Sequence, residues 1–159
     1  GRTRLGYDRP DPASEVTVDG LVAGHDIGVE LALGLLGHVR EAAARMGIAF
    51  AAVVADRSGN PVASCRMDGA PLGAYAIAAD KAYSSALWQA PTRSFAEPSL
   101  PGNGDWGFAN STGGRLIVFA GGLPITVGGA LVGALGVSGG TSDEDEECAL
   151  AGLRADGLA

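Results

Sequence analysis

Three charged residues near the middle of the chain are the first candidates for chemistry. Asp80 and Lys81 are adjacent and are the only charges between Leu72 and Gln89, and Arg66 lies shortly before this stretch. Asp and Lys act as base and acid when burial shifts their pKa values. One interpretation is a catalytic set, Lys81, Asp80 and Arg66, that acts on a small carbonyl or carboxylate compound. The other is that these residues form ion pairs between subunits.

His38, one of two histidines in the chain, is the candidate for holding a metal-containing cofactor. On a helical projection it falls between Ile27 and Leu31, inside an apolar stripe. An imidazole on an apolar wall is a common axial ligand of haem iron, so His38 is predicted to ligate that metal. The alternative is a core or interface histidine hydrogen-bonded to a carbonyl. His25 lies just ahead of the same helix and is predicted to be exposed.

Hydrophobic periodicity and turn residues predict the elements that position these side chains. The expected helices cover residues 26–46, 72–89 and a segment after Thr141, and the expected strands cover 48–55, 61–67 and three stretches within 115–140. Gly47 ends the first helix, and Gly128-Gly129 joins the last two strands. The order α-β-β-α-β-β-β-α predicts an α+β fold, with a five-stranded antiparallel sheet flanked by helices.

Two segments need a separate explanation. The 25 residues from Ala90 to Gly114 carry three prolines, five glycines and three aromatic residues, so this loop is expected to pack on something. The spacing of Thr141 and Glu144 fits a capping box, and the acidic run Asp143–Glu147 is expected to be the solvated start of a helix. A metal site there would need ligands from elsewhere in the chain.

Composition limits the class of protein. The 159 residues are 47% hydrophobic and 18% charged, which favours one globular domain over 25–159, preceded by an N-terminal arm over 1–24. A net charge of −7 without a basic run argues against nucleic acid and anionic membranes as partners. No apolar run is long enough to span a membrane. The two cysteines form no metal or disulfide pattern.

The segment 72–89 is apolar on nearly every side, and a sheet can cover only one side of a helix. The other side is expected to be covered by the long loop or by a second copy of the chain. The sequence therefore predicts a homo-oligomer with a small-molecule pocket at the subunit boundary.

Three blocks of sequence carry a resemblance to a known family. They are RMDGAPLGAYAIAADKAYSSALWQAPT, GGRLIVFAGGLPI and GALVGALGVSGGTSDEDEECALAG. Together they resemble the GlcG/HbpS-like family, also called the haem-degrading domain family, which is related to the C-terminal domain of PduO-type corrinoid adenosyltransferases. The similarity runs from about Asp26 to Leu153.

The resemblance implies a profilin-like α/β/α fold and a homo-oligomer such as a tetramer or octamer. It also implies possible binding or degradation of haem or a related tetrapyrrole. Thr92 matches the family's helix-end Pro-Thr motif, whose hydroxyl faces the pocket in some haem-binding members, although it also suits a loop cap. Gly121 and Gly122 could offer backbone N–H groups to such a ligand, or simply permit a tight turn.

The sequence is compatible with two functions. The first is a homo-oligomeric protein that binds haem or another small molecule, and the second is a cofactor-independent enzyme for proton transfer, isomerisation or hydrolysis. A cytoplasmic location is the expectation, and a secreted one stays open because the chain begins with Gly and a leader could have been removed.

Overall fold

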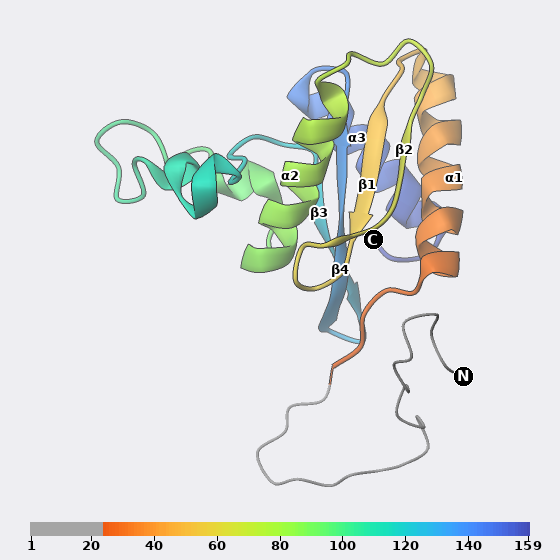
Figure 1. Cartoon of the computed structure of the whole chain (residues 1–159), viewed down its shortest axis with the longest axis horizontal. Coiled ribbons are helices and arrows are strands. Elements are labelled where there is room, and N and C mark those ends of the chain that lie inside the picture. The colour runs from red at the N-terminus through yellow and green to blue at the C-terminus, as the bar shows by residue number, and fades with distance from the viewer. Residues whose placement is uncertain (1–23) are drawn as a thin grey trace, which may run out of the picture.

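The structure is a computed structural model that describes residues 24–159, so the N-terminal arm predicted over 1–24 falls outside it apart from its last residue. The main elements in chain order are α1 (Val29–Met46), β1 (Ala51–Ala55), β2 (Pro61–Arg66), α2 (Ala74–Trp88), β3 (Gly122–Val127), β4 (Ala130–Ser138) and α3 (Ser142–Ala155). Three short 3-10 helices, η1 (Thr92–Phe95), η2 (Phe108–Asn110) and η3 (Thr112–Gly114), lie between α2 and β3. Figure 1 shows the sheet between α2 and α1.

The sheet has four strands in the order β2-β1-β4-β3, and every neighbouring pair is antiparallel. Gly128 and Gly129 have φ values of 59° and 82°, the backbone that a two-residue hairpin turn requires, and they join β3 to β4 as predicted. The α+β class is confirmed.

Alternate residues of β1 face two different helical layers. Ala52 and Val54 belong to the larger core, which they share with residues of α1 and α3. Ala51, Val53 and Ala55 belong to a second cluster with alanines of α2. Because strand side chains alternate between faces, the fully apolar β1 is buried on both sides, and the sheet is flanked by helices as predicted.

The fifth strand expected within 115–140 is not formed. Residues Arg115 to Phe119 make no ladder with the sheet, although Leu116 is only 2% exposed. The backbone N–H of Ile117 instead donates to Ser84 Oγ on α2, at 2.9 Å. A side-chain acceptor on the helix therefore takes the hydrogen bond that a strand partner would have provided.

The helix α2 turns its small side chains to the sheet. Ala74, Ala78 and Ala82 are buried, and a Cβ added to Gly136 of β4 would collide with the Ala78 carbonyl. This close backbone approach explains the glycine in the middle of β4. The larger apolar side chains remain exposed within the chain, among them Tyr75, Leu87 and Trp88.

The helix α1 begins at Val29, three residues later than predicted. Ile27 is buried, but its backbone N–H bonds to the Val132 carbonyl and it lies outside the helix. Leu35 and Val39 face the core as expected, whereas Leu31 is 40% exposed. The buried stripe is thus rotated away from the predicted one. None of the helices in residues 24–159 is both long enough and apolar enough to cross a membrane.

Candidate functional site

Lys81 is the only lysine in the chain, and it is completely buried. Its Nζ donates to Asp145 Oδ2 at 2.6 Å and to the Val137 carbonyl at 2.9 Å, and it lies 5.2 Å from the centre of the Phe119 ring. Asp145 Oδ1 in turn accepts from the Gly140 N–H at 2.9 Å. The pair joins α2 to the first turn of α3 near the start of β3 and the end of β4.

Gly121 leaves the space through which this lysine reaches Asp145, and Gly122 lets the backbone of β3 lie close to the backbone of α2. A Cβ on Gly121 would lie 2.6 Å from Lys81 Nζ, and one on Gly122 would lie 2.5 Å from the Lys81 carbonyl oxygen. Gly121 also has a φ of 116°, which side-chain-bearing residues rarely adopt. These two glycines therefore serve close packing, and their prediction as a ligand-binding backbone remains a prediction.

Thr92 is buried beside the same glycines. Its Oγ1 accepts a hydrogen bond from the Gly122 N–H at 3.0 Å. The hydroxyl therefore satisfies a backbone donor at the first residue of β3, which suits the loop-cap interpretation. We call Lys81, Asp145, Thr92, Gly121 and Gly122 the Lys81 centre. It brings together four residues that the sequence singled out.

Burial dominates the electrostatics of this centre. It lowers the pKa of the Lys81 ammonium and raises the pKa of the Asp145 carboxyl, while the hydrogen bond between them opposes both shifts. A proton could move along the 2.6 Å contact. The carboxylate oxygens and the ammonium are all engaged inside the protein, however, which is the pattern of a structural ion pair.

Asp80 and Arg66 lie apart from the Lys81 centre. Asp80 Oδ1 is 2.9 Å from Arg115 Nε, and the Arg115 guanidinium lies over the Tyr83 ring. Arg66 donates to the Ala70 carbonyl at 3.3 Å. Within residues 24–159 no hydrogen bond or ion pair joins any two of the three predicted catalytic residues.

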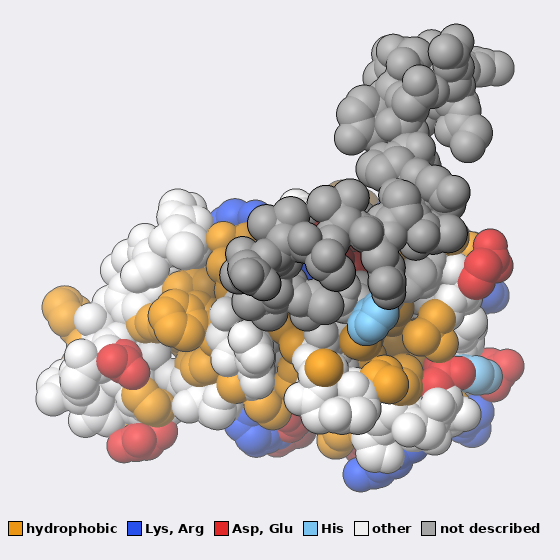
Figure 2. Space-filling view, turned by 90° about the horizontal axis from the view of Figure 1, so that it is seen from below, with side chains coloured by type: hydrophobic (Ala, Val, Ile, Leu, Met, Phe, Trp, Pro, Cys, Tyr) orange, Lys and Arg blue, Asp and Glu red, His pale blue; other side chains and the backbone are white. Residues whose placement is uncertain are grey.

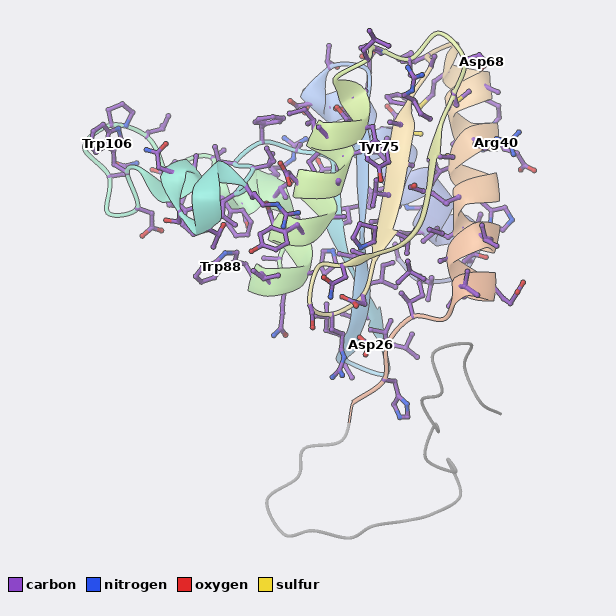
Figure 3. The ribbon with its side chains drawn as sticks, in the orientation of Figure 1. Asp26, Arg40, Asp68, Tyr75, Trp88 and Trp106 are labelled. Atoms are coloured by element: carbon purple, nitrogen blue, oxygen red, sulfur yellow. The ribbon has the colours of Figure 1, made fainter. Side chains whose placement is uncertain are left out.

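Arg66 lines a hollow of about 350 Å³ together with Arg40, Met67 and Asp68. Figure 3 labels Arg40 and Asp68 on the side of the molecule opposite Trp106. The catalytic set is therefore spread over separate places in the chain, and its role remains a prediction.

His38 lies on the flank of α1 that faces the end of α3. Its Nδ1 is 3.0 Å from Asp156 Oδ2, and the imidazole side chain is 37% exposed. Since a carboxylate can only accept, the proton of the neutral ring lies on Nδ1, and Nε2 makes no hydrogen bond to any residue of 24–159. Leu31 lies two helical turns earlier on the same flank, and the space over Gly34 between them is open.

A second kind of site lies between α2 and the loop that follows it. A cavity of about 260 Å³ is lined by Trp88, Phe95, Phe108, Ser99 and Asp105. The ring centres of Trp88 and Phe108 are 5.2 Å apart, and those of Phe95 and Phe108 are 5.4 Å apart. The long loop thus packs its aromatic residues against the end of α2, as its composition suggested.

Sequence reasoning missed both carboxylates that hold the candidate residues. Asp145 was part of an acidic run expected to be solvated, but it is 3% exposed, and Asp156 carried no signal at all. Asp143 and Glu146 of the same run form ion pairs with Arg93. Within residues 24–159, no three His, Cys, Asp or Glu side chains are grouped to hold a metal ion.

Comparison with known sequences finds a family. Residues 27–154 match the family model described as haem degrading protein HbpS-like. Protein GlcG of Escherichia coli K12 is 34% identical over 110 residues, which cover 69% of this chain and 78% of GlcG. An uncharacterized 15.0 kDa protein from the dhaT-dhaS intergenic region of Citrobacter freundii is 35% identical over 92 residues, covering 58% of this chain and 65% of that protein.

The aligned part of corrinoid adenosyltransferase PduO from Salmonella typhimurium is 26% identical over 115 residues. It covers 72% of this chain but only 34% of PduO. The chain therefore spans about a third of PduO and just under two thirds of the 15.0 kDa protein.

Solved structures share the fold. Protein ORFY of Klebsiella pneumoniae has a TM-score of 0.85 at 28% identity, covering 90% of this chain and 99% of that chain. A double mutant of HbpS from Streptomyces reticuli has a TM-score of 0.79 at 31% identity, covering 93% and 99%. A complex of PduOC with haem has a TM-score of 0.81, covering 84% and 97%, and at 23% identity this likeness concerns the fold alone.

The fold therefore defines the class, an α+β domain with a four-stranded antiparallel sheet flanked by helices, as found in these structures. The chain belongs to the HbpS-like family. The resemblance seen in its sequence is confirmed.

Proposed function

We propose that this protein binds haem or a related tetrapyrrole as a homo-oligomer, with His38 as the ligand of the iron. The observation that carries the proposal is the contact between His38 Nδ1 and Asp156 Oδ2. Histidines that ligate metals commonly donate their other ring N–H to a carboxylate, which fixes the tautomer and makes the ligating nitrogen more basic. Membership of the HbpS-like family supports the choice of haem.

The flank of α1 around His38 suits a flat apolar ring system. Gly34 lies one turn before His38 and has nothing within 4 Å of the position of a Cβ, so a planar ligand can approach the helix closely. Leu31 adds an exposed apolar surface. His38, Gly34 and Leu31 are thus the residues that would hold haem, whose iron would supply the redox chemistry of the bound group.

A second copy of the chain would complete this site. One flank of one helix covers only one side of a planar ligand, and binding sites usually bury most of the ligand surface. Large apolar side chains are exposed elsewhere on α1 and α2 as well, including Leu33 and Tyr75. A partner subunit that covers such surfaces would also enclose the ligand.

A titration with haem tests the proposal. We expect a saturable Soret band in the wild-type protein, loss of most affinity in His38→Ala, and a ten- to hundredfold weakening in Asp156→Asn. His25→Ala is the matched control, since His25 is the other histidine and is exposed. Wild-type protein that takes up no haem, or equal affinity in His38→Ala and His25→Ala, would overturn the proposal.

Haem degradation is the finer form of the same proposal. It predicts that the Soret band of the bound protein decays under air with ascorbate, and that ferrozine detects the released iron. The control is free haem under the same conditions. If the Soret band of the bound protein decays no faster than that of free haem, degradation is excluded and haem binding remains the proposed function.

The alternative is a cofactor-independent enzyme, and one observation favours it: the only lysine of the chain is buried beside a carboxylate, behind the partly exposed ring of Phe119. Burial lowers the pKa of Lys81, so the neutral, nucleophilic form of the amine is populated at a lower pH than in a free lysine. In this form of the proposal Lys81 acts with Asp145 rather than with Asp80 and Arg66.

Reductive alkylation distinguishes this alternative. With propanal, an amine condenses with loss of water, and cyanoborohydride reduces the imine. If Lys81 is catalytic, we expect one adduct on Lys81 in the native protein. The variant Lys81→Arg should lack this adduct, since it retains only the terminal amine. Modification of Lys81 only after unfolding in urea would reject it.

A further inference from the structure

The loop over residues 96–114, here called the outer loop, projects from the body of the molecule beside α2 (Figure 1). It is organised by its own hydrogen bonds. The Asp105 N–H donates to the Pro98 carbonyl at 3.1 Å, and the Asn103 side chain donates to the carbonyl and carboxylate of Glu97. The outer loop therefore holds a defined shape rather than serving as a simple link.

The cavity beneath the outer loop has aromatic walls. Phe108 of the loop is tilted against Trp88 by 58° and against Phe95 by 47°. Tilted rings present both faces and edges, which suits a further ring placed among them. A volume of about 260 Å³ is just below the usual range for drug-sized ligands. The cavity therefore suits a single aromatic ring with a short side chain.

The polar groups of the cavity have unused capacity. Ser99 Oγ is buried and has no hydrogen-bond partner among the described residues. Buried hydroxyls are nearly always paired, so an orphan of this kind indicates a missing donor or acceptor. Ser99 lines the cavity together with Asp105, whose carboxylate forms no ion pair within residues 24–159.

The charged residues of the outer loop have one sign. Glu97 and Asp105 are the only charged residues of the outer loop, and both are acidic. The nearest preceding cation, Arg93, is engaged by Asp143 and Glu146. Figure 2 shows acidic and hydrophobic side chains side by side at the end of the molecule that carries the outer loop. This combination attracts a cation that also has an apolar body.

We propose that this cavity binds a small aromatic ammonium compound. The ring packs among Trp88, Phe95 and Phe108, and the ammonium group pairs with Asp105. The Ser99 hydroxyl, which is inaccessible without a ligand, rotates about χ1 to accept a hydrogen bond from the ammonium. A carboxylate on the ligand would face Asp105 without a compensating cation, and a plain hydrocarbon would leave Ser99 unpaired. The site does not involve His38, since both histidines lie away from the outer loop in Figure 2, and it stands independently of the haem proposal.

Tryptophan fluorescence measures this binding directly. The chain has two tryptophans, and Trp106, at the tip of the outer loop in Figure 3, is 68% exposed. The variant Trp106→Phe therefore leaves Trp88 in the cavity as the sole reporter. Titration with 2-phenylethylammonium should change its emission saturably. Phenylacetate, which has the opposite charge, and ethylammonium, which lacks the ring, should each bind at least tenfold more weakly.

Two matched variants in the Trp106→Phe background locate the charge that matters. Asp105→Asn should weaken binding of 2-phenylethylammonium about three- to fivefold, since Asp105 is exposed and its ion pair with the ligand is lost. Glu97→Gln makes the same change of charge in the same loop, but Glu97 does not line the cavity. The affinity of this variant for 2-phenylethylammonium should therefore stay within twofold of that of Trp106→Phe. The loss of affinity in Ser99→Ala should lie between the losses in these two variants.

Three outcomes would overturn the proposal. The first is no saturable change of Trp88 emission with 2-phenylethylammonium. The second is equal weakening in Asp105→Asn and Glu97→Gln, which would indicate general attraction to an acidic surface. The third is the absence of binding together with crosslinking of the outer loop to a second copy, which would show that a second copy of the chain fills the cavity.

Discussion

The Lys81 centre and the outer-loop cavity differ in how their polar groups are used. In the Lys81 centre, the ammonium has two acceptors, Asp145 has donors on both oxygens, and the Thr92 hydroxyl has a backbone partner. In the outer-loop cavity, Ser99 Oγ is equally inaccessible but unpaired. The buried charge of the apolar helix α2 thus holds helices and sheet together within the subunit, whereas the unpaired hydroxyl of Ser99 belongs to the cavity for which we propose a ligand.

Removal of one partner of the buried pair should have the largest effect. Lys81→Met leaves the Asp145 carboxylate buried without its cation, so we expect a loss of about 3–5 kcal/mol of unfolding free energy. Urea denaturation followed by circular dichroism measures it. The double variant Lys81→Met/Asp145→Leu removes both charges and should recover most of the loss. A single-variant cost below about 1 kcal/mol would mean that the pair is not a structural one.

Thr92→Val should lower the unfolding free energy by a smaller amount, about 1–3 kcal/mol. The change nearly conserves shape but leaves the buried Gly122 N–H without its acceptor. Thr126→Val is the control, since Thr126 is an exposed position of β3 and such changes usually fall within about 0.5 kcal/mol. If both variants unfold at the same urea concentration as the wild type, the hydroxyl of Thr92 is free for another task.

The pH dependence of stability tests the electrostatics of the Lys81 centre. Because burial raises the pKa of Asp145, the folded protein holds that proton more tightly, and stability falls as pH rises through the interval above 3.8. Because burial lowers the pKa of Lys81, the unfolded chain holds that proton more tightly in the interval below 10.5, and stability rises with pH there.

The measured quantity is the unfolding free energy of the wild type minus that of Lys81→Met/Asp145→Leu at each pH. This difference should be lowest near neutral pH and should grow toward both ends, by about 1.4 kcal/mol for each unit of pKa shift. A difference that is highest near neutral pH would show that pairing, rather than burial, controls both groups.

Ser99→Ala should have the smallest effect, within about 0.5 kcal/mol, because no hydrogen bond is lost with the hydroxyl. Ser85→Ala is the matched comparison, since Ser85 Oγ is 2.8 Å from the Ala90 carbonyl and its removal should cost about 1 kcal/mol. A larger cost for Ser99→Ala than for Ser85→Ala would indicate that Ser99 is part of the fold and not of a binding site.

Much of the fold could be predicted from local patterns. The Gly128-Gly129 turn, the glycine that ends α1 and the capping box of Thr141 and Glu144 depend on residues close in sequence, and all three are present. The predicted strand before β3 failed because its competitor was distant in sequence: Ser84 on α2 takes the backbone N–H of Ile117. Apolar composition alone could not reveal that contact.

The candidate site residues show the same difference between what local sequence patterns predict and what contacts between distant residues decide. The sequence by itself determined the composition of α2, its single lysine and the glycines that let a helix approach a sheet, because these follow from residue type and spacing. Only the tertiary structure decided that Lys81 meets Asp145, 64 positions away, and that His38 meets Asp156, 118 positions away. Pairing of charges depends on distance in space, which chain order does not encode.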